Sequence, residues 1–280
     1  MKLFDNNGSA GYEIFRGICK VWQKTLFLPA GRKDGLTECA VVFLRFDMTL
    51  NDTVKVIAFD ADDTLWENQP YYDAAEGRFC NILSEYGVPG YIKEELFRTE
   101  MQNMAELGYG AAAFTLSMIE TALRIGGETV SPAEISEIYS VGRSLLRIPA
   151  EPMSGVAGTL KKIRDSGRYR LTVVTKGNIL DQERKLECSG LGKFFDHLEI
   201  VSDKTEKTYT DLLAFHSIKA PELLMVGNSF KSDIAPVLQI GAYGAYIPFH
   251  TTWQHEIVEE YDHPRLLRLT RFEDLCSVLF

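Results

Sequence analysis

Five short apolar runs, separated by amphipathic stretches, limit what this chain can fold into more than any other feature of its sequence. Each run is apolar or β-branched along its length, which is typical of strands buried on both faces of a parallel sheet. The stretches between them carry apolar residues at helical spacing. Strands that alternate with helices predict an α/β fold with a doubly wound parallel sheet. The runs occupy residues 54–59, 171–175, 197–201, 222–226 and 242–247.

A long interval without a strand interrupts this alternation. Between Trp66 and about Ala150, apolar residues recur at spacings of three and four, with breaks at "YGVPG", "LGYG" and "GGETVSP". Four helices joined by short connections predict a helical bundle, inserted directly after the first strand as a cap. We therefore expect residues 48–66 and 151–280 to form an α/β core and residues 67–150 to form the cap.

The first 47 residues have no clear place in the sheet. They contain Gly and Asn clusters and one short apolar run, and Met48 stands just ahead of the first strand. We interpret residues 1–47 either as a poorly ordered extension or as the product of a start codon assigned too far upstream.

Composition excludes several classes of function. The 280 residues carry a net charge of −9, which argues against a nucleic-acid partner. No apolar run approaches the roughly 18 residues that a membrane helix needs, so we expect no membrane association. Five scattered cysteines fit neither a disulfide framework nor a zinc site, and reduced thiols favour a cytoplasmic protein. The sequence does not indicate an oligomeric state.

Three carboxylates, Asp60, Asp62 and Asp63, directly follow the apolar run "VKVIAF". Like charges this close repel, and a buried unpaired carboxylate is costly, so the cluster predicts a positive partner. A turn or a helix cap would explain "DxD" taken alone, because Asp is common after strands.

Polar residues also follow the other predicted strands. Thr175 ends the second strand beside a glycine turn, Lys204 follows the third, and "GNSFKSD" follows the fourth with Asn228 and Asp233. The carboxyl ends of parallel strands meet at one edge of the sheet, where ligands bind in open α/β folds. We therefore expect these side chains to converge on one site.

With these four features in order, the chain resembles the haloacid dehalogenase superfamily of hydrolases and phosphatases over residues 54 to about 250. The first motif of that family, D-x-D-x-T, stands here as residues 60–64. Its second motif is Thr175, its third a lysine, and its fourth the acidic glycine turn. The resemblance implies a Rossmann-like core with an inserted cap.

The resemblance also implies a Mg²⁺-dependent phosphatase of small phosphorylated metabolites. Asp60 would be the nucleophile that forms an aspartyl-phosphate, and Asp62 would be the general acid and base. Thr175, the neighbouring Lys176 and the motif lysine would neutralise the phosphoryl oxygens. Mg²⁺, the predicted positive partner of the cluster, would be held by Asp60, the main-chain carbonyl of Asp62, Asn228 and Asp233. An acid at position 62 also favours phosphate esters over the dehalogenation that gave the superfamily its name.

Some positions leave alternatives open. Asn228 stands where the family most often has aspartate, which weakens the metal site or marks a degenerate copy. The motif lysine is Lys204 or Lys207, and we choose Lys204 because it sits at the strand end. Lys176 either touches substrate or, in the interpretation that we prefer, is an ordinary exposed turn lysine.

Two aromatic segments are also ambiguous. Trp66, directly after the first motif, either closes over substrate or packs in the core. The loop 248–256 carries His250, Trp253 and His255. We interpret these three as isolated surface or packing residues in preference to a loop beside the substrate.

Two other classes of function compete with the phosphatase. A catalytically weak or dead metal- and phosphate-binding protein would explain Asn228. A receiver-like phospho-aspartate switch would use the same residue types, but receivers phosphorylate an aspartate after a middle strand and carry no helical insertion here.

Overall fold

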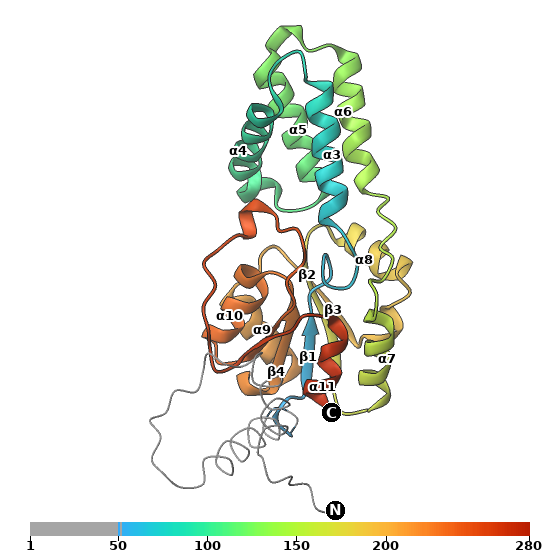
Figure 1. Cartoon of the computed structure of the whole chain (residues 1–280), viewed down its shortest axis with the longest axis vertical. Coiled ribbons are helices and arrows are strands. Elements are labelled where there is room, and N and C mark those ends of the chain that lie inside the picture. The colour runs from blue at the N-terminus through green and yellow to red at the C-terminus, as the bar shows by residue number, and fades with distance from the viewer. Residues whose placement is uncertain (1–49, 51) are drawn as a thin grey trace, which may run out of the picture. The chain divides into compact units, whose positions relative to one another are not determined.

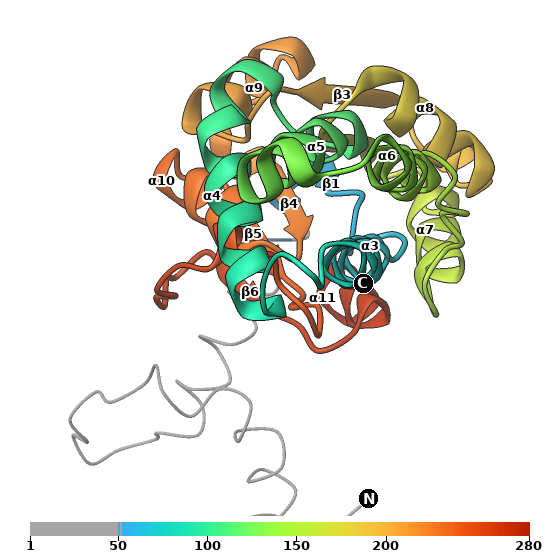
Figure 2. The same cartoon turned by 90° about the horizontal axis from the view of Figure 1, so that it is seen from above.

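In the described residues, six parallel strands form one sheet in the order β3-β2-β1-β4-β5-β6; Figure 1 labels the first four strands and Figure 2 labels β5 and β6. The computed structural model describes residue 50 and residues 52–280. Strand β1 lies between its neighbours β2 and β4, with Val56 opposite Arg170 on one side and Leu223 on the other. The strands are β1 (Val56–Phe59), β2 (Arg170–Lys176), β3 (His197–Val201), β4 (Leu223–Gly227), β5 (Tyr243–Tyr246) and β6 (Leu266–Arg268).

Helices cover both faces of the sheet because the central strands are apolar on both faces. Val56 and Ala58 of β1 belong to the hydrophobic cluster that includes residues of α9 and α10. Ile57 and Phe59 belong to a second cluster that includes residues of α7 and α11. The helices of the sheet layer are α7 (Val156–Asp165), α8 (Ile179–Cys188), α9 (Glu206–His216), α10 (Ala235–Gln239) and α11 (Leu275–Leu279).

Four helices between β1 and β2 in the chain surround a hydrophobic cluster of their own. They lie beyond the carboxyl ends of the strands, and the view from above shows them over the sheet (Figure 2). Ser131 and Glu134 form a capping box that starts the last of them. They are α3 (Gln69–Ile82), α4 (Pro89–Leu107), α5 (Ala111–Gly126) and α6 (Pro132–Leu145). The division into a core and a cap at residues 67 and 150 stays our proposal.

Short helical segments complete the architecture of the described residues 52–280, which belong to one compact unit. A turn of π-helix, η4 (Phe230–Ile234), follows β4, and the 3-10 turn η5 (Gln254–Glu256) lies in the loop after β5. The other 3-10 turns are η1 (Gly127–Thr129), η2 (Gly192–Phe194), η3 (Ala220–Glu222) and η6 (Phe272–Asp274).

The predicted fold class is confirmed by the parallel sheet and its helical layers. The sixth strand was not predicted, because β6 has only three residues and follows a charged segment. The interpretation of residues 1–47 falls outside the described residues. Cys80, Cys188 and Cys276 are free thiols. Within the described part of the chain, no helix is long and apolar enough to span a membrane.

Candidate active site

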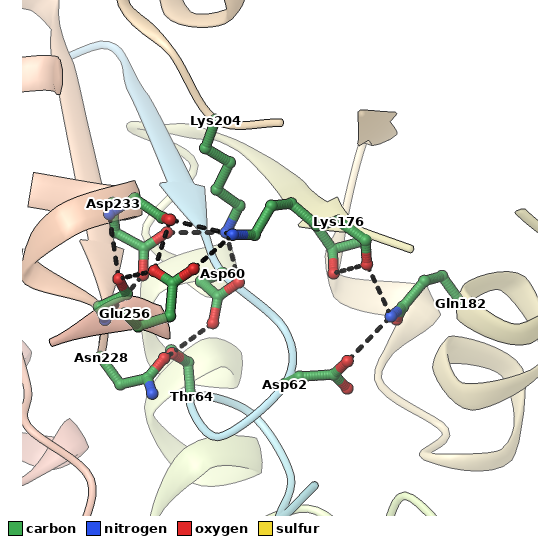
Figure 3. Close-up of polar contacts among 12 residues, drawn as sticks. Asp60, Asp62, Thr64, Lys176, Gln182, Lys204, Asn228, Asp233 and Glu256 are labelled. Atoms are coloured by element: carbon green, nitrogen blue, oxygen red, sulfur yellow. Dashed lines mark hydrogen bonds and ion pairs between the residues drawn. The ribbon is translucent and has the colours of Figure 1, made fainter. Parts of the chain in front are cut away.

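Asp60 is the first residue after β1 and marks the centre of the site (Figure 3). Its main-chain N–H donates to the Val226 carbonyl at 2.9 Å, which continues the ladder between β1 and β4. Its carboxylate accepts a hydrogen bond from Thr64 Oγ1 at 2.9 Å and contacts the ammonium of Lys204. Burial raises the pKa of Asp60 to about 7, with the Lys204 charge opposing the shift and the Asp233 charge adding to it.

Lys204 joins Asp60 to Asp233 in a buried ion-pair network. Its Nζ lies 2.7 Å from Asp233 Oδ1, and its side chain is 2% exposed. Although burial opposes the charged form, Asp233 and Asp60 together raise the pKa of Lys204, so the ammonium persists. Lys207, the alternative motif residue, is exposed and pairs with Asp211 at 2.5 Å. The structure therefore brings Lys204 to the site and leaves Lys207 on the surface.

The turn after β4 positions Asp233. This residue lies in η4, and its Oδ2 accepts the Ser229 main-chain N–H at 3.0 Å. A Cβ added at Gly227 would stand 2.2 Å from the same oxygen. Glycine at the end of β4 is therefore required for the carboxylate of Asp233 to approach the strand.

Asp62 lies in a separate set of contacts. Its Oδ1 accepts from Trp66 Nε1 at 2.7 Å, and its Oδ2 accepts from Gln182 Nε2 at 2.9 Å. Lys185 Nζ lies 3.0 Å from Oδ1 and 3.1 Å from Oδ2. Burial alone would raise the pKa of Asp62, but the Lys185 charge and these hydrogen bonds lower it. Trp66 is buried and bonded to Asp62, which supports the core-packing alternative.

Asp63 is bonded to the start of the first cap helix. Its Oδ1 accepts the main-chain N–H groups of Asn68 and Gln69 at 2.8 and 3.0 Å, which satisfies donors that a helix end leaves free. Burial raises the pKa of Asp63 to about 7, against the effect of these bonds.

The cluster of carboxylates thus has partners within the chain. Lys204 contacts Asp60, Lys185 contacts Asp62, and helix N–H groups contact Asp63. These lysines and N–H groups are partners that the sequence analysis did not name, and the bound cation stays a prediction. The case for a metal depends on the oxygen donors themselves.

Three oxygen-bearing side chains of the predicted metal set lie together. Thr64 Oγ1 is hydrogen-bonded to Asp60 Oδ2 and, at 3.1 Å, to Asn228 Oδ1, while Lys204 joins Asp60 to Asp233. Among the described residues, no group of three or more His, Cys, Asp and Glu is arranged to hold a metal. Two carboxylates, one amide oxygen and main-chain carbonyls are nevertheless the hard oxygen donors that Mg²⁺ accepts, with water completing its shell.

Thr175 and Lys176, at the end of β2, also line the site. Lys176 Nζ lies 2.7 Å from Glu256 Oε1 and 3.0 Å from Ser232 Oγ, and it stands 4.2 Å from the centre of the Tyr109 ring. The alternative of an exposed turn lysine is therefore wrong, since 15% of the side chain is exposed.

The loop after β5 reaches the site as well. Glu256 accepts hydrogen bonds from Ser229 Oγ and Ser232 Oγ at 2.5 and 2.6 Å. The Lys176 charge and these bonds outweigh burial and lower the pKa of Glu256 to about 2. Trp253 lines the cavity and lies edge-on to Tyr109. Our interpretation of this loop as isolated surface or packing residues is therefore wrong for Trp253, which contacts a cap residue at the cavity wall.

A cavity of about 200 Å³ joins these groups to the inner side of the cap. All its lysines come from the sheet layer, whereas α3 and α4 contribute carboxylates. Its wall includes Asp60, Asp62, Thr175, Lys176, Lys185, Lys204, Asn228 and Asp233 from below and Tyr72, Asp73, Glu76, Glu100 and Asn103 from the cap.

Three residues of the site were missed in the sequence. Gln182 and Lys185 lie on α8 in a strongly polar stretch, "DQERKLE", where a lysine normally faces solvent. Their spacing of three places them on one helix face with Asp181, and that coincidence of polar residues was the available signal. Glu256 stands in a loop without regular pattern and carried no signal.

Comparison with known proteins gives a consistent picture. The pattern of the haloacid dehalogenase-like hydrolases matches residues 54–241. A glyceraldehyde 3-phosphate phosphatase of Methanothermobacter thermautotrophicus is 25% identical, over 67% of this chain and 83% of its own length. A 5-amino-6-(5-phospho-D-ribitylamino)uracil phosphatase of Escherichia coli is 23% identical, over 78% of this chain and 95% of its own.

Solved structures share the fold. A haloacid dehalogenase-like family hydrolase from Xanthomonas campestris is 34% identical, with a TM-score of 0.72 over 81% of this chain and 92% of its own. An L-2-haloacid dehalogenase from Xanthobacter autotrophicus is 16% identical, with a TM-score of 0.57 over 81% of this chain and 98% of its own. At this identity the match is evidence for the shared fold only. The resemblance inferred from the four motifs and the expected enzyme class, a phosphoric monoester hydrolase, are confirmed by these matches.

Proposed function

The chain belongs to the haloacid dehalogenase-like hydrolases, and we propose that it is a Mg²⁺-dependent phosphatase of small phosphate monoesters that works through an aspartyl-phosphate. The observation that carries the proposal is the environment of Asp60. A carboxylate at the end of the central strand faces a cavity, beside a buried ammonium and a second carboxylate. Such a group is placed to attack an electrophile that carries negative charge, because Lys204 offsets that charge.

The first step forms one bond and breaks another. A carboxylate oxygen of Asp60 attacks phosphorus, and the bond between phosphorus and the ester oxygen breaks. Asp62 donates its proton to that leaving oxygen. The lowered pKa of Asp62 keeps it ionised in the free protein, but a phosphate dianion bound beside it favours the protonated form.

The second step restores the enzyme. Water attacks the phosphorus of the aspartyl-phosphate and gives its proton to Asp62, and the bond to Asp60 breaks as inorganic phosphate leaves. Thr175 donates a hydrogen bond to the phosphoryl oxygens, and Lys176 and Lys204 compensate their charge during both steps. The Glu256 carboxylate holds Lys176 at 2.7 Å and fixes the position of its ammonium.

Asp60, the main-chain carbonyl of Asp62, Asn228 and Asp233 would hold the magnesium ion. The side-chain oxygens of Asp62 already accept from Trp66, Gln182 and Lys185, which fits a role for its carbonyl alone. When bound, Mg²⁺ supplies positive charge that neutralises the phosphoryl group and favours the ionised form of the nucleophile.

The cavity supports a small substrate whose organic part bears hydrogen-bond donors. Asp73, Glu76 and Glu100 line the cap side, so a leaving group with hydroxyl or amino groups finds acceptors there. A leaving group with its own carboxylate would be repelled. The names of the two phosphatases described above also give small phosphorylated compounds as their substrates.

Release of phosphate from a panel of small monoesters, with Mg²⁺ and with EDTA, tests the proposal. We expect Mg²⁺-dependent turnover that Asp60→Asn lowers at least about a thousand-fold. Asp211→Asn, an exposed residue paired with Lys207, is the matched control and should keep full activity.

Other results would favour the competing functions. Retained Mg²⁺ binding with no turnover across the panel would favour a binding protein weakened by Asn228. A phospho-aspartate that persists for many minutes would favour a switch.

A further inference from the structure

Lys185 is a buried lysine for which neither the motifs nor the reaction above assigns a role. Its side chain is 1% exposed, on the inner face of α8. A lysine this deeply buried is rare and needs charged or polar partners. Here the ammonium contacts both oxygens of Asp62, lies 3.5 Å from Asp181 Oδ2 and donates to Asn68 Oδ1 at 2.9 Å.

We propose that Lys185, assisted by Gln182, is a positioning residue that fixes the carboxyl group of Asp62 toward the leaving oxygen of the substrate. The inference rests on the proposed function, in which Asp62 transfers the proton. Proton transfer needs the donor and the acceptor oxygen aligned within hydrogen-bond reach, so the orientation of the Asp62 carboxyl group decides its efficiency.

The contacts around Asp62 fix that orientation from several directions. Trp66 donates to one oxygen, Gln182 donates to the other, and Lys185 spans both. Trp66 comes from the same loop as Asp62, whereas the other two donors come from α8. Gln182 also donates to the Lys176 carbonyl at 3.0 Å, which ties the arrangement to the end of β2.

The same ammonium also reaches the entrance of the cap. Asn68 immediately precedes α3, and its main-chain N–H donates to Asp63. Lys185 therefore bonds the proton-transferring residue and the segment that leads into the cap at once. Loss of the ammonium leaves Asp62 with neutral donors only and removes one tie to that segment.

Two esters whose leaving groups differ in their need for a proton distinguish a role of Lys185 in positioning Asp62 from a role in stabilising the fold. p-Nitrophenolate leaves without much need for a proton, whereas the alkoxide from glycerol 1-phosphate needs one. The constant kcat/KM depends on the steps from substrate binding to phosphoryl transfer onto Asp60. It is therefore sensitive, for both esters, to the proton that Asp62 gives to the leaving oxygen.

We expect Lys185→Met to lower kcat/KM for glycerol 1-phosphate at least about ten-fold more than for p-nitrophenyl phosphate. Lys185→Arg should recover part of that difference, because it restores the charge. In an Asp62→Asn background, Lys185→Met should add no further selective loss, since it acts through the missing group. Lys161→Met, an exposed residue on α7 paired with Asp165, is the control.

Equal losses for both esters, or a selective loss that persists in the Asp62→Asn background, would overturn the inference. If Lys185→Met does not fold, the ratio of kcat/KM for the two esters is measured in Lys185→Arg and in Gln182→Met instead. A ratio equal to that of the wild type in both variants would overturn the inference. Failure of the proposed function looks different: the wild type would hydrolyse neither ester, or Asp60→Asn would stay active.

Discussion

Asp60, Asp62 and Asp63 stand within four positions of one another, yet the fold gives each a different electrostatic environment. Asp60 faces Lys204 and a second carboxylate, Asp62 faces Lys185 with neutral donors, and Asp63 faces helix N–H groups. Burial raises the pKa of Asp60 and Asp63, whereas Lys185 and the donors lower that of Asp62. The roles proposed above for these residues, as nucleophile, proton carrier and partner of a helix end, therefore rest on the difference between their partners.

Asn228→Asp is expected to strengthen the metal site. The amide oxygen of Asn228 shares Thr64 as a hydrogen-bond donor with Asp60, so a carboxylate there adds negative charge beside the nucleophile. The Mg²⁺ concentration for half-maximal phosphate release should fall about ten-fold. Asn228→Ala, which removes the oxygen, should raise it. An unchanged Mg²⁺ requirement in both variants would exclude Asn228 from the metal shell.

Glu256→Gln is expected to destabilise the protein in a pH-dependent way. The folded pKa of Glu256, about 2, lies below the ordinary value of 4.5, so its ionised form stabilises the fold above pH 4.5. That contribution is lost as the pH falls from 4.5 towards 2. The variant should lose about 2 kcal/mol of unfolding free energy at pH 7 and much less at pH 3.

Denaturant unfolding of both proteins at the two pH values measures this difference. Asp165→Asn, whose exposed partner is Lys161, should change little at either pH. A loss for Glu256→Gln that is equal at pH 3 and pH 7 would contradict the role of its charge.

Among single residues, those at or just beyond the ends of strands could be predicted and those on α8 could not. Asp60, Thr175, Lys204 and Asp233 lie at or beyond the carboxyl ends of different strands, and a parallel sheet brings those ends together. Lys185 gave no comparable signal, because a lysine within a polar helix looks solvated until the helix is placed against the sheet. The three-dimensional packing of α8 alone brings it to Asp62.

At the scale of elements, the turn between β4 and η4 is the most demanding piece of local geometry. Gly227→Ala would place a Cβ against the Asp233 carboxylate, which must then move away from Lys204. We expect activity to fall at least about a hundred-fold. Gly158→Ala on α7, where a Cβ meets nothing within 4 Å, is the matched control and should stabilise the helix slightly. Full activity of Gly227→Ala would contradict this reading of the turn.

The elements themselves were largely predictable because their apolar patterns differ in period. The four predicted cap segments follow helical spacing and correspond to α3–α6. The five predicted apolar runs correspond to β1–β5 within a few residues. Strand β6 was not predicted because three residues are too few to show a strand pattern, and the strand forms through its pairing with β5. The position of the loop from β5 to η5 was not predicted either, because contacts with η4 and β2 hold Glu256 in place and no local sequence pattern does.

For the molecule as a whole, the sheet side of the cavity carries both lysines and carboxylates, whereas the described residues on its cap side include carboxylates but no lysine. Lys176 and Lys204 lie at strand ends and Lys185 lies on α8, whereas Glu76 and Glu100 lie on the cap side. Burial, with the Glu76 charge, raises the pKa of Glu100 to about 8. The cap side therefore gains negative charge as the pH rises through 8.

This titration predicts pH-dependent selectivity. The ratio of kcat/KM for glycerol 1-phosphate to that for 2-phosphoglycolate should rise between pH 6.5 and pH 9, because ionised Glu100 repels the carboxylate of the second ester. Glu100→Gln should remove most of that rise, and Glu106→Gln is the control from the same helix. A ratio with the same pH dependence in wild type and Glu100→Gln would exclude this selection.

The central claim is that Asp60 carries the phosphoryl group, and rapid acid quench during turnover tests it most directly. Peptide mapping of the quenched enzyme should find a hydroxylamine-sensitive phosphate on Asp60, formed with Mg²⁺ and absent from Asp60→Asn. Turnover without any covalent phosphoenzyme, or a phosphate on another residue such as Asp233, would contradict the account.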